Sequence, residues 1–190
     1  INTIPKNVIN AFLSAEDKNF FKHPGVDAKG VLRAIINNFK NILTSKRMEG
    51  ASTITQQVAK NFLLSSEVTF ERKIKEAILA IRIERAFSKK EILELYLNEI
   101  YLGNNSYGIA AAALNYFDKS LDDLTIDEAA FLATLPKAPS KYNPKTNYER
   151  VLDRRNWVLN QMYKNGYLTA DEKNKFQSNR IVLKKSSGLD

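Results

Sequence analysis

The sequence has no cysteine and a single histidine, His23, and these scarcities exclude several kinds of chemistry. Without cysteine there is no disulfide, no thiol nucleophile and no thiolate metal ligand. A zinc site draws mainly on cysteine and histidine, so one histidine argues against such a site. A serine–histidine catalytic pair would have to use His23. The lack of cysteine is compatible with a reducing or an oxidising compartment and does not locate the protein.

Glycine and proline are scarce as well, with seven and five among 190 residues, which argues against disorder and against a turn-rich all-β fold. No apolar run approaches the roughly 18 to 20 residues that a membrane-spanning helix needs, and no signal peptide is visible. The chain begins at Ile1 rather than at a methionine, which leaves open an anchor outside this sequence. A net charge of +8 indicates an anionic partner: nucleic acid, a phosphate or diphosphate, or a membrane surface.

Apolar periodicity and capping signals run through nearly the whole chain, so we predict an all-α fold, one compact domain that can divide into two lobes. Boxes of the Ser/Thr-x-x-Glu/Gln type open four of the helices, at Thr53, Ser88, Thr125 and Thr169. The predicted helices cover about residues 6–21, 28–43, 53–62, 70–86, 88–100, 109–117, 125–135, 148–165 and 169–178. Residues 41–52 are predicted to be a mobile loop, and residues 180–183 a short strand or the start of a following segment.

Residues 50–61, Gly-Ala-Ser-Thr-Ile-Thr-Gln-Gln-Val-Ala-Lys-Asn, begin with small residues and continue as a helix. Ile54, Val58 and Phe62 recur at a helical spacing and predict a buried stripe. The polar side chains on the other side are those of Thr53, Gln56, Gln57 and Lys60. Together with the positive end of the helix dipole, such a face can bind a polar, anionic ligand. The alternative is an ordinary solvated face.

The long helix over residues 70–86 carries a second apolar stripe next to a group of cations. The stripe is predicted to be buried and comprises Phe70, Ile74, Ala77, Ile78 and Ile81. Lys60, Arg72 and Lys73 flank the connector over residues 61–69 and could converge on a diphosphate, with lysine as a point charge and arginine as a bidentate fork. The alternative for Arg72 is a surface ion pair with Glu76, four residues further on.

Glu16 and Asp17 lie near the end of the first predicted helix, just before Phe20 and Phe21. Adjacent helical residues point about 100° apart, so the two carboxylates are not expected to share a role. Desolvation beside phenylalanine can tune the proton affinity of a carboxylate, which suits a general base; the alternative is an ordinary pair of acids near a helix end. On local grounds His23, in a His-Pro-Gly turn, is expected to make a local hydrogen bond.

The helix predicted over residues 28–43 is amphipathic and has basic flanks. Its apolar side comprises Leu32, Ile35, Ile36, Phe39 and Leu43. A helix of this kind beside a mobile loop can lie in a membrane interface. The alternative is a face that packs against the protein core.

Five motifs in order make the chain resemble the glycosyltransferase domain of class A penicillin-binding proteins, which also occurs as monofunctional peptidoglycan glycosyltransferases. The resemblance runs from about residue 4 to about residue 162, and the motifs are residues 16–25, 50–61, 72–76, 92–108 and 154–162. One such motif alone would be a weak signal, whereas five in the right order are specific. Ala51 replaces the usual glycine, and Val68 stands where many relatives carry an arginine that could contact phosphate.

The resemblance implies a lysozyme-like fold with a globular lobe and a smaller membrane-facing lobe. The glycosyltransferase domain is expected over residues 1–178 and the start of a linker over residues 179–190. A membrane anchor and a transpeptidase domain are expected outside this chain, because the tail resembles that of a bifunctional enzyme. The implied reaction is the polymerisation of lipid II into β-1,4-linked glycan strands by inverting transfer, with release of undecaprenyl diphosphate.

The family's catalytic and binding residues carry over to matching positions. Glu16 is assigned as the base that deprotonates the incoming sugar 4-hydroxyl, and Glu76 as a catalytic residue that orients the cations or a metal. The residues expected to bind sugars and phosphates are Asp17, His23, Ser52, Thr55, Gln56, Gln57, Lys60, Asn61, Arg72, Lys73 and Asn98. A divalent cation, Mg²⁺ or Mn²⁺, is left open as a helper at the diphosphate, and no other cofactor is expected.

The implied partners are lipid II, the growing glycan strand and the bacterial membrane, with division or elongation machinery reached through regions outside this chain; nucleic acid is not among them. The implied location is the outer side of the bacterial cytoplasmic membrane. Two rival hypotheses remain. One is a lytic enzyme of the same fold that cleaves glycan strands and has little use for the cations. The other is a non-enzymatic basic helical module that binds nucleic acid or anionic lipid.

Overall fold

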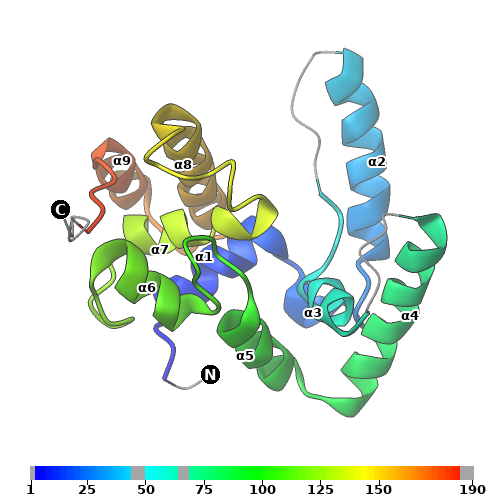
Figure 1. The fold of residues 1–190 in the computed structure, drawn as a ribbon. Coiled ribbons are helices and arrows are strands. Elements are labelled where there is room, and N and C mark those ends of the chain that lie inside the picture. Colours follow the sequence, from blue (N-terminus) through cyan, green and yellow to red (C-terminus); the bar gives the residue numbers. More distant parts are fainter. Residues whose placement is uncertain (1–2, 44–49, 64–68, 185–190) are drawn as a thin grey trace. The chain divides into compact units, whose positions relative to one another are not determined.

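The computed structural model describes residues 3–43, 50–63 and 69–184. Within these ranges the chain forms nine α-helices, two 3₁₀ helices and no strand, so the all-α prediction is confirmed (Figure 1). An isolated antiparallel bridge joins Tyr101 to Tyr107. Residues 180–184 form no regular element. Half of the predicted mobile loop, residues 44–49, lies outside the described residues, and so do Val68 and the side chains of Phe39 and Leu43.

The chain divides into two compact units, as the two-lobe expectation proposed. The terminal unit combines residues 1–18 with residues 97–190, and the inserted unit is formed by residues 19–96. The terminal unit contains α1 (Lys6–Glu16), α6 (Ile109–Phe117), α7 (Ile126–Leu132), η2 (Leu135–Lys137), α8 (Tyr148–Lys164) and α9 (Ala170–Ser178). The inserted unit contains η1 (Phe20–Lys22), α2 (Ala28–Leu43), α3 (Ile54–Phe62) and α4 (Phe70–Ala86). The boundary between the units falls within α5 (Lys89–Glu99).

The terminal unit has an apolar core built around α7. This helix contacts α1, α6, α8 and α9. Ala129 and Ala130 are fully buried, and their small side chains allow neighbouring helices to approach closely. Phe131 is fully buried as well and makes edge-to-face contacts with Tyr116 and Phe117, at ring-centroid distances of 5.2 and 5.5 Å. The large apolar side chains of this helix therefore face inward, as its periodicity predicts.

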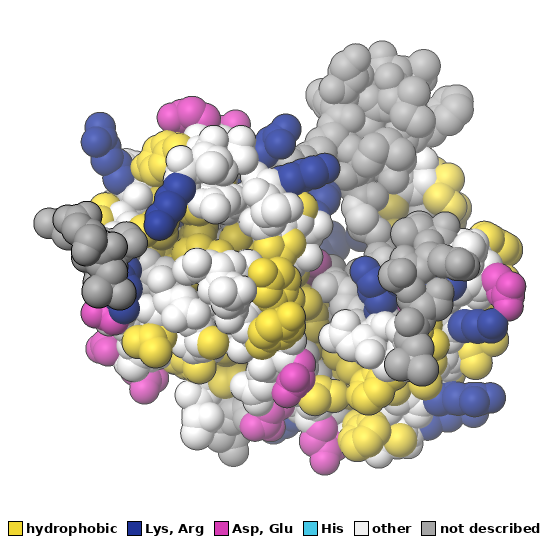
Figure 2. Space-filling view, viewed as in Figure 1, with side chains coloured by type: hydrophobic (Ala, Val, Ile, Leu, Met, Phe, Trp, Pro, Cys, Tyr) yellow, Lys and Arg dark blue, Asp and Glu magenta, His cyan; other side chains and the backbone are white. Residues whose placement is uncertain are grey.

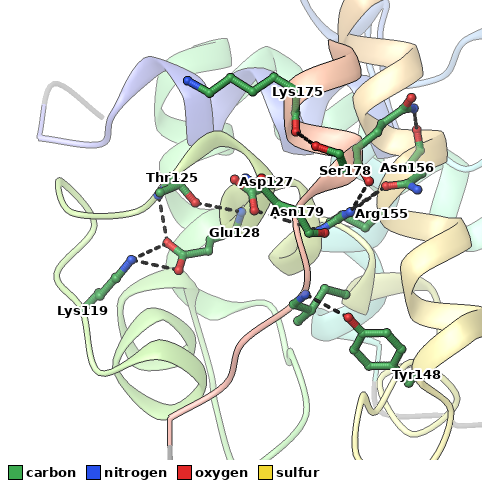
Figure 3. A network of polar contacts seen from close by, with 12 residues as sticks. Lys119, Thr125, Asp127, Glu128, Tyr148, Arg155, Asn156, Lys175, Ser178 and Asn179 are labelled. Carbon is green, nitrogen blue, oxygen red and sulfur yellow. Dashed lines mark hydrogen bonds and ion pairs between the residues drawn. The ribbon is translucent and has the colours of Figure 1, made fainter. Parts of the chain in front are cut away.

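A polar network inside the terminal unit is centred on Arg155 of α8, which is fully buried (Figure 3). Its guanidinium donates to two backbone carbonyls at the end of α9, those of Gln177 at 3.1 Å and Asn179 at 2.8 Å. It also donates to the side chain of Asn156 and lies 4.0 Å from the carboxylate of Asp127. Desolvation lowers the pKa of Arg155, and the charge of Asp127 opposes this shift. The network holds the end of α9 against α8.

The first helix is shorter than its apolar pattern predicts. It ends at Glu16 because the next residue, Asp17, is extended, with φ near −160°. The pattern continues to Phe21, but this residue and Phe20 belong to the separate turn η1. There Phe20 is buried, with the Lys89 ammonium 4.3 Å from its ring centroid. Apolar spacing can thus continue across a boundary between units, where it no longer reports a single helix.

The predicted buried stripe of α4 is wrong. Its large members are exposed, with exposed fractions from 37% for Ile81 to 83% for Phe70. The buried residues lie on the opposite face of the helix and are Glu76, Ala80 and Ile83. A Cβ atom on Gly25, whose φ is +100°, would lie 2.8 Å from the Ala80 carbonyl oxygen, so the His-Pro-Gly turn packs directly on this face. Periodicity found the stripe, but the close backbone contact decided which face is inside.

The same arrangement recurs on α2 and α3 of the inserted unit. On α2 the small residue Ala34 is buried, whereas the large residues of the predicted apolar side are exposed, namely Leu32, Ile35 and Ile36. On α3, Ile54 and Val58 are buried as predicted, but Phe62 is exposed. The inserted unit therefore presents large apolar side chains outward from three helices. Figure 2 shows hydrophobic side chains interspersed with lysine and arginine on the side where Figure 1 draws α4.

Candidate functional site

The start of α3 is fixed by the predicted capping box, which the structure confirms. The Gln56 N–H donates to the Thr53 hydroxyl at 3.1 Å, and the Thr53 N–H donates to the Gln56 amide oxygen at 3.0 Å. The Thr53 hydroxyl donates in turn to the Gly25 carbonyl at 2.5 Å. These bonds satisfy backbone groups that the first turn of a helix otherwise leaves open. The start of α3 is thereby attached to the turn that packs on α4.

Most of the polar residues predicted on α3 make contacts within the inserted unit and do not form an open face. The Thr55 hydroxyl is buried and donates to Glu84 at 2.5 Å, and the Gln56 side chain is buried in the capping box. Gln57 is half-buried and accepts a hydrogen bond from the Tyr96 hydroxyl at 3.3 Å. The alternative of a solvated polar face is therefore wrong for Thr53 and Gln56, which are buried. The proposed substrate contacts on α3 stay predictions.

Two predicted binding residues further along α3, Lys60 and Asn61, are exposed. In the part of the chain that the structure describes, the Lys60 ammonium has no ion-pair or hydrogen-bond partner. A cation in this state has its full charge available to an external anion. Lys60 lies in the last turn of α3, where a basic residue also interacts favourably with the helix dipole.

Lys73 connects the start of α3 to the first turns of α4. Its ammonium group donates to the Ser52 hydroxyl at 2.9 Å and to the carboxylate of Glu76 in a short contact. The Glu76 residue is only 4% exposed, whereas half of the Lys73 side chain is accessible. A buried carboxylate next to an accessible ammonium holds that ammonium in one position. The structure therefore brings together three predicted site residues, Ser52, Lys73 and Glu76.

The alternative for Arg72 was a surface ion pair with Glu76, but Glu76 does not lie at the surface. Glu76 is buried and contacts Lys73, and an exposed ion pair on this helix joins Glu71 to Lys75 at 2.7 Å. Arg72 is half-buried near the start of α4, and the Thr69 hydroxyl caps its backbone N–H at 3.2 Å. The convergence of Lys60, Arg72 and Lys73 on one anion stays a prediction.

The His-Pro-Gly turn confirms the local role expected for His23. The ring is buried, and its Nδ1 atom accepts a hydrogen bond from the Gly25 N–H at 3.1 Å. Gly25 has a positive φ and lies against α4, so a side chain at this position would clash. The contact between His23 and substrate stays a prediction.

The predicted base and two further predicted residues belong to the terminal unit. Glu16 is the last residue of α1 and is half-buried, whereas Asp17 is buried and its N–H donates to the Leu13 carbonyl at 2.9 Å. The two adjacent residues therefore differ in burial, and Asp17 lies beyond the end of the helix from which their separation was predicted. Asn98 is exposed near the end of α5, and its backbone carbonyl lies against Gly108.

The divalent cation expected at the diphosphate stays a prediction. Among residues 3–43, 50–63 and 69–184, no group of three or more His, Asp or Glu side chains is arranged to hold a metal ion. The buried carboxylate of Glu76, which was assigned to cations or a metal, contacts the Lys73 ammonium. None of the helices in the described part of the chain is long and apolar enough to cross a membrane.

Two residues in contact with α3, Glu84 and Tyr96, were not predicted to have a role. Tyr96 lies inside the fourth motif, but nothing in its sequence neighbourhood points to Gln57, 39 positions away. Glu84 is one charge among several near the end of α4. The packing of α3 against α4 brings Glu84 to Thr55, and Tyr96 reaches Gln57 from α5.

A family model described as "Transglycosylase" matches residues 1–163. Penicillin-binding protein 1A of Rickettsia felis is 57% identical over 185 residues, which cover 97% of this chain and 23% of that protein. Penicillin-binding protein 1A of Aquifex aeolicus is 51% identical over 187 residues, which cover 98% of this chain and 25% of that protein. The chain thus spans about a quarter of the length of these relatives.

A solved structure is also similar, that of penicillin-binding protein 1A from Haemophilus influenzae. The TM-score is 0.50 and the sequence identity 39%, over 69% of this chain and 16% of that chain. The all-helical fold and the sequence similarity therefore point to the same family.

Proposed function

This chain belongs to the transglycosylase family and is a peptidoglycan glycosyltransferase domain, and from this premise we propose that it polymerises lipid II into β-1,4-linked glycan strands. The observation that carries the proposal is the accessible Lys73 ammonium, which Ser52 and Glu76 hold in place. A lipid-linked donor presents a diphosphate, which needs positive charge as it leaves. A lytic enzyme has no diphosphate to bind.

The reaction transfers one proton and exchanges one bond. The 4-hydroxyl oxygen of the acceptor sugar attacks C1 of the donor sugar, and the bond from C1 to the diphosphate oxygen breaks. The diphosphate leaves with the electron pair as undecaprenyl diphosphate, and the hydroxyl proton passes to the Glu16 carboxylate. Direct attack inverts an α-linked donor into a β product. Since a diphosphate neutralised by cations is a good leaving group, the general acid of a glycosidase is not required.

Lys73 is the residue best prepared to stabilise the leaving group. An ammonium group has three N–H donors, and Ser52 and Glu76 take two of them in the described part of the chain. The third is available to a phosphate oxygen, and half of the side chain is accessible. Because Glu76 and Ser52 fix the ammonium before the donor binds, little reorganisation is needed during the reaction. Lys60 and Arg72 supply further positive charge.

A divalent cation stays a prediction and enters no step of this mechanism. The described residues offer no protein cage for it. Activity measured across a series of EDTA and Mg²⁺ concentrations tests the requirement.

We further propose that the inserted unit lies against the outer surface of the cytoplasmic membrane. Leu32 on α2 and Ile78 on α4 are among the large apolar residues that it exposes. Lys29 and Arg33 lie beside them on α2 and would interact with anionic lipid headgroups. A lipid-linked substrate would then reach the enzyme without leaving the bilayer. Division or elongation machinery would be contacted through regions outside this chain.

The deciding experiment compares this chain with its Glu16→Gln variant in a polymerisation assay with fluorescent lipid II. We expect glycan synthesis to fall by about 10²- to 10⁴-fold, because the base is lost, while lipid II binding remains. Normal glycan synthesis by the Glu16→Gln variant would refute the assignment of Glu16 as the base. Degradation of purified cell wall without polymerisation would indicate the lytic enzyme. Binding to nucleic acid or anionic lipid that Glu16→Gln leaves intact, without either reaction, would indicate the non-enzymatic module.

A second comparison tests the diphosphate contact. Lys60→Ala removes an exposed cation of α3, and we expect the turnover or donor affinity to fall by about 10- to 100-fold, as for a lost hydrogen bond to a charged group. The matched control is Lys75→Ala on α4, since this exposed lysine pairs with Glu71. Equal activities of the two variants would remove Lys60 from the mechanism.

A further inference from the structure

Glu84 is the centre of a small polar network in the inserted unit. One of its carboxylate oxygens accepts from the Thr55 hydroxyl of α3 at 2.5 Å and from the Lys89 ammonium of α5 at 2.6 Å. Only 8% of the Glu84 side chain is exposed. A carboxylate this far removed from water is stable when its oxygens are hydrogen-bonded and a cation is close, and both conditions are met here.

The network reaches two further segments. The Lys89 ammonium lies over the ring of Phe20 in η1, 4.3 Å from its centroid. A Cβ atom on Gly25 would lie 3.1 Å from Cγ of Glu84, so the His-Pro-Gly turn packs against the same side chain. That turn also accepts the Thr53 hydroxyl bond described above. Glu84 therefore joins the starts of α3 and α5, the turn after η1 and the second half of α4.

The start of α3 is held to α4 at two separate points. One is the bond between Ser52 and Lys73, and the other is the bond between Thr55 and Glu84. Lys73 and Glu84 are eleven residues apart, which corresponds to about 16 Å along a helix axis. Attachment at two points this far apart fixes the angle of the first turn of α3 as well as its position.

From this geometry we propose that Glu84 is a positioning residue for the transfer reaction. It acts through Thr55: the two side chains fix the first turn of α3, and Ser52, just before that turn, then meets Lys73 at the place where the donor diphosphate is to bind. Thr55, predicted from the sequence as a binding residue, serves on this view as a support of the helix. The inference rests on the proposed function, because it assigns the geometry to diphosphate binding.

The test uses variants of Thr55, because they remove one bond and leave the ion pair between Glu84 and Lys89 in place. Thr55→Val keeps the size of the side chain but loses the hydroxyl, whereas Thr55→Ser keeps the hydroxyl. We expect kcat/KM for lipid II to fall by about 10- to 100-fold in Thr55→Val, as misplacement of positioning groups does. Thr55→Ser is expected to stay within about twofold of the unchanged chain. Glu84→Gln, which retains an acceptor oxygen, is expected to lie between the two.

The matched control is Glu71→Gln on the same helix. Its ion pair with Lys75 is exposed, with 77% and 63% of the two side chains accessible, and its loss is expected to leave kcat/KM unchanged. Thermal unfolding of all variants is measured alongside. A lower melting temperature with an unchanged kcat/KM in Thr55→Val would mean that the network only stabilises the fold, and it would overturn the proposal.

Amide hydrogen exchange of α3 separates this inference from the proposed function. We expect faster exchange in the first turn of α3 in Thr55→Val and Glu84→Gln, and no change in Glu71→Gln. If the unchanged chain does not polymerise lipid II, the proposed function fails, whereas the exchange data still report whether Glu84 positions α3. If the chain polymerises and both kcat/KM and exchange are unaffected in Thr55→Val, the positioning role is refuted.

Discussion

The two units of this molecule use the same kind of helix but bury different residues. In the terminal unit the large apolar side chains of Phe131 and Leu132 on α7 are fully buried. In the inserted unit small residues such as Ala34 and Ala80 make the close contacts, and Phe70 and its neighbours on α4 face outward. The comparison shows that an apolar stripe indicates a face in need of an apolar neighbour. In the terminal unit this neighbour is protein, and in the inserted unit we propose that it is lipid.

The largest difference is expected when a phenylalanine of each unit is replaced by alanine. Phe131→Ala should lower the free energy of unfolding by about 3–5 kcal/mol, because it leaves a cavity among packed aromatic rings. Phe70→Ala on α4 removes a side chain that is exposed, and its cost should stay below about 0.5 kcal/mol. Urea unfolding of both variants measures the two values. Equal losses would mean that the two units do not differ in this way.

The next prediction concerns the buried polar network of the terminal unit, which is centred on Arg155. Arg155→Met removes the buried guanidinium from the terminal unit and leaves the carbonyls of Gln177 and Asn179 without their donor. We expect a loss of about 2–3 kcal/mol in the free energy of unfolding, since buried acceptors lose their partners. Faster amide exchange should follow at Ile181, whose N–H donates to the Tyr148 hydroxyl at 3.1 Å in the segment after α9. Unchanged exchange at Ile181 would show that this segment does not depend on Arg155.

Membrane binding is expected to depend on the inserted unit alone. In the double variant Leu32→Glu/Ile78→Glu, two exposed apolar residues become charged, and binding to vesicles that contain anionic lipid should weaken by about tenfold or more. The control is Leu114→Glu/Val182→Glu, which makes the same change in charge at exposed apolar residues of the terminal unit. Sedimentation with vesicles measures both. Equal weakening would point to charge alone, and the proposed membrane face would be abandoned.

The helices could be predicted from the sequence because their signals are local. The capping pairs at Thr53, Ser88, Thr125 and Thr169 each lie within four residues, and the structure contains all of them. The side that each helix buries could not be predicted for the inserted unit, because it depends on backbone contacts such as that of Gly25 with Ala80, 55 positions apart. The end of α1 was missed for the same kind of reason, since a change of unit interrupts the helix but not its apolar pattern.

In the candidate site, too, contacts between residues close in the sequence could be predicted, whereas contacts between distant residues could not. Lys73 and Glu76 lie on one helix turn and could be grouped from their spacing alone, whereas Ser52 joins them only through the packing of α3 on α4. Thr55 and Glu84 were not connected at all, because 29 positions separate them and neither neighbourhood carries a signal for the other. A motif therefore indicates which residues take part, and the fold determines whether each one contacts the ligand or supports another residue.

The smallest expected effect is that of low pH on the stability of the first turn of α2. Burial alone would raise the pKa of Asp27, but hydrogen bonds from the Asn19 side chain and the Gly30 N–H outweigh it and lower the pKa below its ordinary value. A lowered pKa in the folded state stabilises the fold above the unfolded pKa, and this contribution disappears as the pH falls through the folded value. The protection of the Gly30 and Val31 amides against exchange should therefore decrease below about pH 4. Asp27→Asn keeps a capping oxygen without the charge, so its protection should change less over the same range; an equal decrease in both would assign the effect to other carboxylates.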